Sequence, residues 1–262
     1  MSYPTADPGS SAALRAVFKS ADKDMRQKLV PMLPPEIVSF AGIRMYVDPR
    51  DNYTDRMIWR DGVPPENRCL AALSALVAGR NTVVFDVGAN SGAYTLPLAR
   101  AAGAGSKVIA IEPNPTMIGR LGHNLRLNDL GAIVRIESCA LGACAGEEML
   151  YFRSRNHGQA SLLPIRERVR DGATLVPVRT LLEFWHEAVA FDRVVLKIDV
   201  EGTEDRVLAP LLDADVALPH AILMETAHAD AWARPLVRDL LRANYAITFE
   251  AEKNTLFVRD VG

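Results

Sequence analysis

Residues 83–92, with the sequence VVFDVGANSG, describe a buried strand that breaks into a glycine-containing loop and then a helix. The next apolar strand, residues 107–112, ends on an acidic residue, Glu112. Glycine lets the backbone approach a ligand closely, and a carboxylate at the end of the second strand can accept two hydrogen bonds from a ribose diol. The two motifs together predict a nucleoside pocket at the carboxyl end of a parallel sheet.

Strand and helix signals alternate from residue 82 onward. Apolar runs predict parallel strands at 82–87, 107–112, 133–136, 194–199 and 221–225. Amphipathic stretches predict helices near 92–102, 115–128, 203–212 and 231–243, and two last strands are expected at 245–249 and 255–259. This alternation predicts a doubly wound, mostly parallel α/β sheet with right-handed crossovers, closed by an antiparallel C-terminal hairpin.

The chain before this region is expected to form an N-terminal α+β appendage over residues 1–64. Its predicted parts are a frayed start over the first ten residues, a polar helix at 12–29 and a small hairpin at 36–47 that turns at Ala41-Gly42. Residues 65–262 form the predicted main domain, which begins with a helix at 65–78. Residues 147–180 are expected to form short strands and a polar loop (153–172). Together with the appendage, this insert is expected to cover the sheet edge and shape the pocket.

Composition limits the partners. The chain has 262 residues, 49% of them hydrophobic, which suits one large domain or a domain with an appendage. Its net charge is −2, which argues against a nucleic-acid partner, and a local basic group at Arg166, Arg168 and Arg170 is interpreted as a solvated face. Three cysteines without metal-site spacing, and no apolar stretch long enough for a membrane span, predict a cytoplasmic protein.

The glycine-containing loop differs from a dinucleotide-binding loop. It lacks the second glycine of G-x-G-x-x-G and carries Asp86 two residues before Gly88. A carboxylate repels a pyrophosphate but suits a cation, so the loop favours S-adenosylmethionine, which is positive at sulfur and at its amino group. The predicted cofactor-binding residues are Asp86, Gly88, Ala89, Asn90, Ser91, Gly92, Glu112 and Pro113, with Ser138, Cys139 and Ala140 flanking the adenine. Ser138 and Cys139 are small, so backbone contacts would serve there, and Cys139 is equally well explained as a small buried hydrophobe.

Four sequence segments resemble one known family. They are FDVGANSG (85–92), IEPNP (111–115), ALG (140–142) and LKIDVEGTE (196–204). In this order and spacing they resemble the FkbM family of S-adenosylmethionine-dependent methyltransferases, over about residues 50 to 260. The resemblance implies the seven-stranded class I methyltransferase fold. It also implies transfer of a methyl group from S-adenosylmethionine to a hydroxyl oxygen of a sugar, glycan or natural-product small molecule.

The catalytic candidates follow from the needs of methyl transfer to an alcohol, which requires alignment and a base or a metal. Lys197 and Asp199 share one face of a strand, with Asp199 at the carboxyl end. Asp199 is interpreted as a base, as a group that orients the acceptor, or as a partner of the cofactor amine, and Lys197 as its neutralising cation. His228 follows the fifth strand and is a second candidate base, with a surface residue as the alternative.

Other functions are weaker interpretations of the same residues. A helix is expected to begin at Glu201, Glu204 and Asp205, and acids are favoured there by the helix dipole. A divalent ion held by Asp199 with Glu201 or Glu225 is not favoured. An N-methyltransferase of nucleic acid would carry an Asn-Pro-Pro-Tyr-like motif where this chain has IDVEG (198–202). A non-catalytic S-adenosylmethionine-binding protein is the remaining alternative. The acceptor and the oligomeric state are left open by the sequence.

Overall fold

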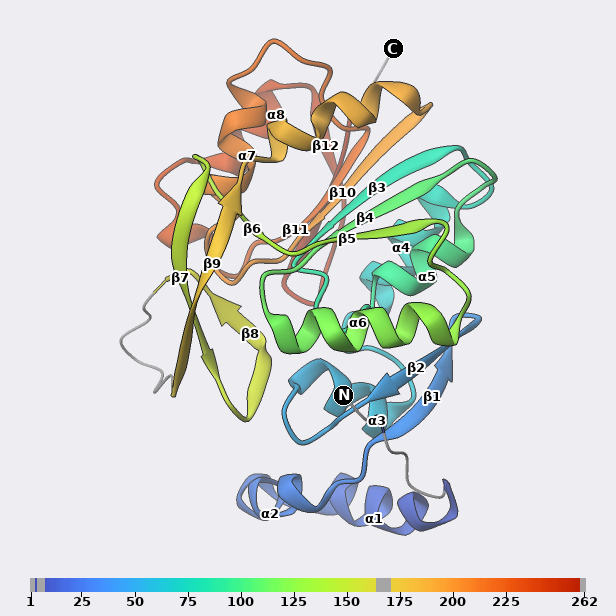
Figure 1. The fold of residues 1–262 in the computed structure, drawn as a ribbon. Coiled ribbons are helices and arrows are strands. Elements are labelled where there is room, and N and C mark those ends of the chain that lie inside the picture. Colours follow the sequence, from blue (N-terminus) through green and yellow to red (C-terminus); the bar gives the residue numbers. More distant parts are fainter. Residues whose placement is uncertain (1–2, 4–7, 164–170, 260–262) are drawn as a thin grey trace.

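A seven-stranded sheet forms the centre of the protein. The computed structural model describes residues 3, 8–163 and 171–259. The strand order is β12-β13-β11-β10-β3-β4-β5 (Figure 1). The parallel strands are β3 (Thr82–Val87), β4 (Lys107–Ile111), β5 (Val134–Glu137), β10 (Arg193–Ile198) and β11 (Ala221–Glu225). The hairpin of β12 (Tyr245–Ala251) and β13 (Asn254–Arg259) adds the antiparallel edge.

Helices cover both faces of this sheet because both faces of its strands are apolar. On one face Val84 and Val108 pack against α4 (Asn67–Val77), α5 (Thr95–Ala101) and α6 (Pro115–Leu127). On the other face, Val83 and Phe85 pack against the 3-10 helix η2 (Leu181–Ala190), α7 (Glu204–Leu212) and α8 (Leu236–Arg242). Successive strand residues thus serve opposite cores. The expected doubly wound class I methyltransferase fold with its C-terminal antiparallel hairpin is confirmed.

The N-terminal segment differs in detail from the expectation. Instead of one helix over 12–29 there are α1 (Pro8–Ser20), α2 (Lys23–Leu29) and the 3-10 turn η1 (Val30–Met32). The break falls at Asp22, which is extended and whose carboxylate accepts the Met25 N–H at 2.8 Å as the cap of α2. Helix α1 already begins inside the stretch expected to fray, while residues 1, 2 and 4–7 lie outside the described part.

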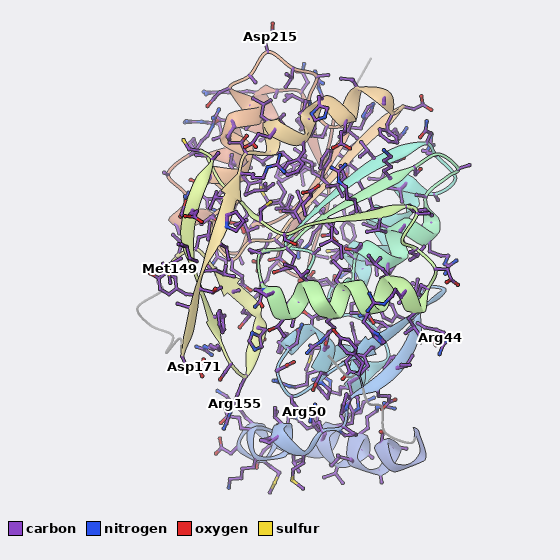
Figure 2. All side chains as sticks on the ribbon, in the orientation of Figure 1. Arg44, Arg50, Met149, Arg155, Asp171 and Asp215 are labelled. Atoms are coloured by element: carbon purple, nitrogen blue, oxygen red, sulfur yellow. The ribbon has the colours of Figure 1, made fainter. Side chains whose placement is uncertain are left out.

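The expected hairpin is present as β1 (Glu36–Phe40) and β2 (Ile43–Val47), and α6 holds it through two asparagines. The Asn124 amide bonds the backbone N–H and C=O of Tyr46 at 2.8 and 3.2 Å, and Asn128 does the same to Arg44 at 2.8 and 2.6 Å. Four residues along a helix advance about 6 Å, close to the advance of two residues along a strand. The two amides therefore pair with β2 as a neighbouring strand would. Figure 2 shows Arg44 on β2, at the right edge of the view.

Helix α3 (Tyr53–Asp61) was not expected from the sequence. Asn52 caps its start by accepting the N–H groups of Thr54 and Asp55, and Gly62 ends it in the left-handed region with φ +80°. Its buried face includes Trp59, which is 0% exposed. Helix α3 lies just before the predicted domain boundary at residue 65.

The insert forms a second sheet of four strands in the order β6-β9-β7-β8. Its strands are β6 (Ala140–Leu141), β7 (Gly146–Arg153), β8 (Asn156–Ser161) and β9 (Gly172–Arg179). Strand β8 falls inside the segment expected to be a polar loop, whereas 164–170, with the three arginines considered above, lies outside the described residues. Figure 2 shows Met149 of β7, and Asp171 just before β9, at the side of the molecule away from Arg44. Across the described ranges, no helix has the length and apolar character needed to cross a bilayer.

Candidate functional site

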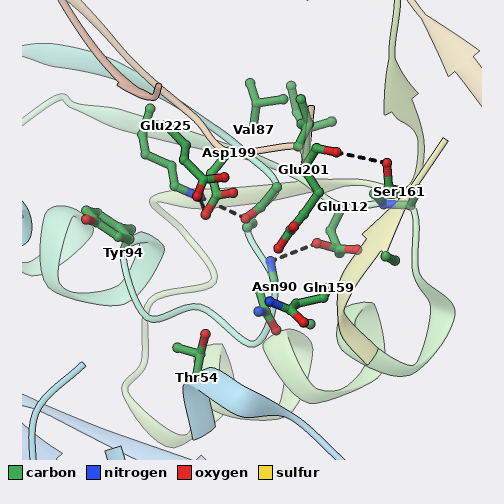
Figure 3. Close-up of a pocket in the computed structure, with 18 of the residues that line it drawn as sticks. Thr54, Val87, Asn90, Tyr94, Glu112, Gln159, Ser161, Asp199, Glu201 and Glu225 are labelled. Carbon is green, nitrogen blue, oxygen red and sulfur yellow. Dashed lines mark hydrogen bonds and ion pairs between the residues drawn. The ribbon is translucent and has the colours of Figure 1, made fainter. Parts of the chain in front are cut away.

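A cavity of about 410 Å³ opens where the parallel strands end, which is the ligand-binding edge of an open α/β sheet. Figure 3 shows Asn90, Glu112, Asp199 and Glu225 converging on it. The wall comes from the ends of four central strands, from α3, from β8 and from the tip of the C-terminal hairpin. The main sheet supplies the lining residues Val87 to Asn90, Ile111 to Pro113, Asp199 to Glu201 and Glu225.

Gly88 lets three strand ends meet beneath the cavity. Its φ is +79°, and a Cβ atom at this position would lie 1.9 Å from the carbonyl oxygen of Asp199. The Gly88 and Ala89 N–H groups donate to the Ile111 carbonyl at 2.9 and 3.1 Å. Only glycine fits here, because the conformation is left-handed and the space is already filled by backbone.

Glu112 presents a carboxylate with both oxygens already oriented by backbone. Its two oxygens accept the N–H groups of Asn90 and Asn114, each at 2.8 Å. The side chain lines the cavity although the residue is only 6% exposed. Burial raises the pKa of Glu112 to about 7, against the lowering effect of the two N–H groups. Each oxygen retains acceptor capacity, so the pair is suited to two adjacent hydroxyl groups.

Four of the predicted cofactor-binding residues lie behind or beside the cavity wall. Asp86 is 0% exposed, accepts the Thr95 hydroxyl at 2.5 Å and lies 3.5 Å from the Lys197 ammonium. Its carboxylate is therefore already engaged behind the loop. Ser91, Gly92 and Ser138 likewise are not lining residues, whereas Cys139, Ala140 and Pro113 are.

Ser91 is instead a link between the loop and α3. Its hydroxyl donates to Asp55 at 2.6 Å, and the other oxygen of Asp55 accepts from Arg120 at 2.8 Å. Next to it, the Asn52 amide donates to the Asn90 side-chain oxygen at 2.6 Å. Helix α3 therefore braces the loop that forms the cavity floor.

Lys197 is the buried cation at the centre of the site. Its ammonium donates to the Gly88 carbonyl at 3.0 Å, lies 3.7 Å from the Asp199 carboxylate and stands 5.3 Å from the Tyr94 ring centroid. Burial alone lowers the pKa of Lys197, but Asp86 and Asp199 outweigh it and raise this pKa above its ordinary value. The lysine therefore stays charged and fixes the position of Asp199.

Carboxylates gather at one end of the cavity. Asp199, Glu201 and Glu225 line this end together with Glu66 from the start of α4. Burial, followed by repulsion from Asp199, raises the pKa of both Glu225 and Glu66. The imidazole of His228, which is not a lining residue, lies 3.9 Å from the nearest Glu225 oxygen. This end of the site favours a cation.

The wall that faces the main sheet comes from the insert and the N-terminal appendage, the two segments expected to shape the pocket, but the strand and the helix that form it were not predicted. Strand β8 contributes His157 to Ser161, and α3 contributes Tyr53 and Thr54. The His157 N–H donates to the Asp51 carbonyl at 2.7 Å, and the Ser161 hydroxyl donates to the Glu201 carbonyl at 3.1 Å. Strand β8 thus spans from the N-terminal segment to the loop after β10. Asn52, with an acidic residue, Asp55, in the first turn that follows it, is a helix-start signal that would have indicated α3, but the pattern of β8 carries no such signal.

The comparison with protein families identifies this chain. The sequence matches the Methyltransferase FkbM domain over residues 86–247, which is more than half of its length. The seven-stranded fold is of the class I methyltransferase type. The chain belongs to the FkbM methyltransferase family.

Solved structures with similar folds are distant in sequence. A methyltransferase FkbM from Methylobacillus flagellatus KT is 17% identical, with a TM-score of 0.45, over 69% of this chain and 44% of that one. A methyltransferase from Geobacter sulfurreducens is 15% identical, with a TM-score of 0.46, over 98% of both chains. Magnesium protoporphyrin IX methyltransferase from Synechocystis PCC 6803, solved with bound S-adenosylmethionine, is 14% identical, with a TM-score of 0.44, over 98% of this chain and 100% of that one. The chain thus spans less than half the length of the Methylobacillus protein. No curated protein matches the sequence.

Proposed function

We propose that this protein transfers the methyl group of S-adenosylmethionine to a hydroxyl oxygen of a sugar, glycan or natural-product small molecule. One observation carries the proposal. A single cavity has Glu112 at one side and the carboxylates of Asp199 and Glu225 at the other, above a floor of Gly88, Ala89 and Asn90. Membership of the FkbM methyltransferase family supports the same activity.

The cavity matches the chemistry of the methyl donor. The oriented carboxylate of Glu112 suits the ribose diol, and Pro113, Cys139 and Ala140 offer a small, mostly apolar wall for the adenine. The acidic end suits the ammonium and sulfonium groups of the donor. A dinucleotide would bring a pyrophosphate toward these carboxylates, which the buried Lys197 only partly offsets. In this proposal Asp86, Ser91 and Gly92 act indirectly, by holding the loop and Lys197 in place.

Asp199 is the proposed catalytic residue. It lines the cavity and is held by the Lys197 ammonium at 3.7 Å, so its carboxylate has a fixed direction. In methyl transfer the acceptor oxygen attacks the methyl carbon, the carbon–sulfur bond breaks and the sulfur leaves as a neutral thioether. Asp199 would align the acceptor hydroxyl and take its proton, with His228 as the second proposed proton acceptor.

Two measurements test this function. Isothermal titration calorimetry with S-adenosylmethionine and with NAD should show binding of the methyl donor alone. Incubation of the full chain with methyl-labelled donor and a panel of sugars and hydroxylated natural products should then release S-adenosylhomocysteine and a methyl ether, read by mass spectrometry. Tight NAD binding would overturn the cofactor assignment. Donor binding without S-adenosylhomocysteine for any acceptor would indicate a binding protein, and a methylated nitrogen would indicate an N-methyltransferase.

A further inference from the structure

Three potential metal ligands meet beside Asp199, each on a different segment. Glu201 follows β10, Glu225 ends β11 and His228 precedes the 3-10 turn η3 (Ala229–Ala231). The His228 Nε2 atom lies 3.9 Å from a Glu225 oxygen and 4.0 Å from a Glu201 oxygen. One ligand atom from each residue lies within 4.8 Å of the other two. Figure 3 shows Glu225 beside Asp199, with the Glu201 side chain between this pair and Glu112.

These separations are close to those around a shared ion. Oxygen and nitrogen ligands lie about 2.0 to 2.2 Å from a divalent transition metal, so two ligands of one ion are separated by roughly 3 to 4 Å. The two distances from His228 Nε2 lie at the upper end of this range, and the third separation is no more than 4.8 Å, so the three side chains need to draw slightly closer to share one ion. One imidazole with two carboxylates is a ligand set for Mn²⁺, Fe²⁺, Co²⁺ or Zn²⁺, whereas Mg²⁺ and Ca²⁺ prefer oxygen alone.

A buried acid holds the two loops that carry Glu201 and His228. Glu204 is 0% exposed, and one of its oxygens accepts the N–H groups of Val200 and Gly202, each at 3.2 Å. Its other oxygen accepts the indole N–H of Trp232 at 2.8 Å, just after the turn that follows His228. The third ligand, Glu225, is paired in the sheet with Asn254 of β13. Contacts of the surrounding residues thus hold the three segments that bear the ligands, as outer-shell contacts do in known metal sites.

We propose that Glu201, Glu225 and His228 bind one divalent transition-metal ion. The ion would lie beside Asp199 at the acidic end of the cavity, where the proposed function places the acceptor hydroxyl. A metal ion at this position lowers the pKa of a hydroxyl bound to it. This catalytic role rests on the proposed function, whereas binding of the ion does not.

Titration with Mn²⁺ alone tests the site. The full chain, without methyl donor or acceptor, is titrated with Mn²⁺ and free ion is followed by electron paramagnetic resonance. We expect one saturable site, and roughly 10-fold or greater weakening in Glu225→Gln and in His228→Ala, because each removes one of three ligands. Glu147→Gln and His186→Ala alter exposed residues elsewhere and serve as matched controls that retain wild-type affinity. Bound Mn²⁺ should also raise the wild-type unfolding temperature.

The possible results separate this inference from the proposed function. Absence of saturable Mn²⁺ binding, or unchanged affinity in either ligand variant, overturns the site. Each ligand variant must keep the far-ultraviolet circular dichroism spectrum of the wild type and a cooperative unfolding transition, which shows that it is folded; if Glu225→Gln fails this check, Glu225→Asp, which keeps the carboxylate, is tested for partial retention of Mn²⁺ affinity. Release of S-adenosylhomocysteine without Mn²⁺ binding overturns only the metal site. Mn²⁺ binding by a chain that methylates no acceptor leaves the site standing and removes the proposed function.

Discussion

Gly88 and Asp199 are in direct backbone contact, because the position that a Cβ atom of Gly88 would occupy lies 1.9 Å from the Asp199 carbonyl oxygen. This contact joins the loop after β3 to the end of β10. It sets the proposed cofactor floor and the proposed catalytic carboxylate at a fixed separation, since the Lys197 ammonium also bonds the Gly88 carbonyl at 3.0 Å. The geometry of the site is therefore built into the backbone and does not depend on side-chain packing alone.

Replacing Gly88 by alanine should disrupt this junction. The added methyl group meets backbone that cannot move without shifting β10, and φ +79° is strained for any residue with a Cβ. We expect Gly88→Ala to lower the free energy of unfolding by at least about 2 kcal/mol and to abolish measurable donor binding. Gly131→Ala is the control, because nothing lies within 4 Å of a Cβ there. Chemical denaturation and calorimetry check both variants, and donor affinity like the wild type in Gly88→Ala would contradict the close contact.

Glu112→Gln should weaken donor binding without unfolding the protein. Glutamine keeps the size of the side chain but has one oxygen, so it cannot accept both the Asn90 and Asn114 N–H groups and a ribose diol. Loss of a charge-assisted hydrogen bond of about 1.5–3 kcal/mol corresponds to roughly 10- to 100-fold weaker binding. Calorimetric titration with S-adenosylmethionine measures this change. Glu147→Gln, on an exposed stretch of β7, should bind the donor normally, and equal affinities in the two variants would exclude Glu112 from the site.

The raised pKa of Glu112 also predicts a pH dependence of stability. Burial raises this pKa from 4.5 to about 7, so the folded protein holds a proton that the unfolded chain has released between these two values. The stabilisation present below pH 4.5 is therefore lost as pH rises toward 7, by roughly 3 kcal/mol in total. Urea denaturation of the wild type and Glu112→Gln across this range isolates the effect, because glutamine does not titrate. The stability of the wild type relative to Glu112→Gln should fall as pH rises, and a relative stability that stays constant or increases with pH would contradict the assignment.

Asp55 and Asp61 lie on the same helix, α3, but should differ in their effect on stability. Asp55 is 0% exposed and binds Arg120 and Ser91, so Asp55→Ala leaves a buried guanidinium without one of its carboxylates. We expect a loss of about 3–5 kcal/mol in the free energy of unfolding. Asp61 pairs with Arg60 and Lys19 at the surface, and Asp61→Ala should cost no more than about 1 kcal/mol. Urea denaturation measures the free energy of unfolding of both variants. If Asp55→Ala loses no more stability than Asp61→Ala, the contacts of Asp55 do not brace the loop.

The sequence predicted the part of the fold that repeats a simple physical pattern. Strands β3, β4, β10 and β11 are apolar on both faces and end in polar residues, so their order in the chain and their functional edge could be recognised. Gly88 and Glu112 allowed the pocket to be predicted, because a glycine and an acid at the ends of neighbouring parallel strands are typical of a nucleoside site. The two helices α1 and α2 were merged because only Ala21 and the cap residue Asp22 separate them.

The rest of the site depends on tertiary contacts that leave no local pattern. Ser91 was expected at the cofactor, but its hydroxyl is turned away by Asp55, a residue 36 positions earlier in the chain. His157 and Ser161 reach the cavity on a short edge strand that is placed by bonds to Asp51 and Glu201. Pairings of this kind are set by the folded backbone and are invisible to hydrophobic periodicity.

Asp199→Asn should separate catalysis from donor binding. Asparagine keeps the size of the side chain but cannot take the acceptor proton, and Lys197 remains paired with Asp86 at 3.5 Å, so the buried cation is still neutralised. We expect turnover to fall by about 100-fold or more, as for loss of a general base, while the affinity for S-adenosylmethionine falls much less, because Glu66, Glu201 and Glu225 remain at the acidic end of the cavity. Release of S-adenosylhomocysteine with an accepted substrate gives kcat, and calorimetry gives the donor affinity. Asp230→Asn, at an exposed position in η3, is the control for removing one carboxylate near the site. Near-normal turnover in Asp199→Asn with unchanged donor affinity would move the role of base to His228 or, if the proposed metal ion is bound by His228, to a species bound to that ion, because Asp199 would then be only a partner of Lys197.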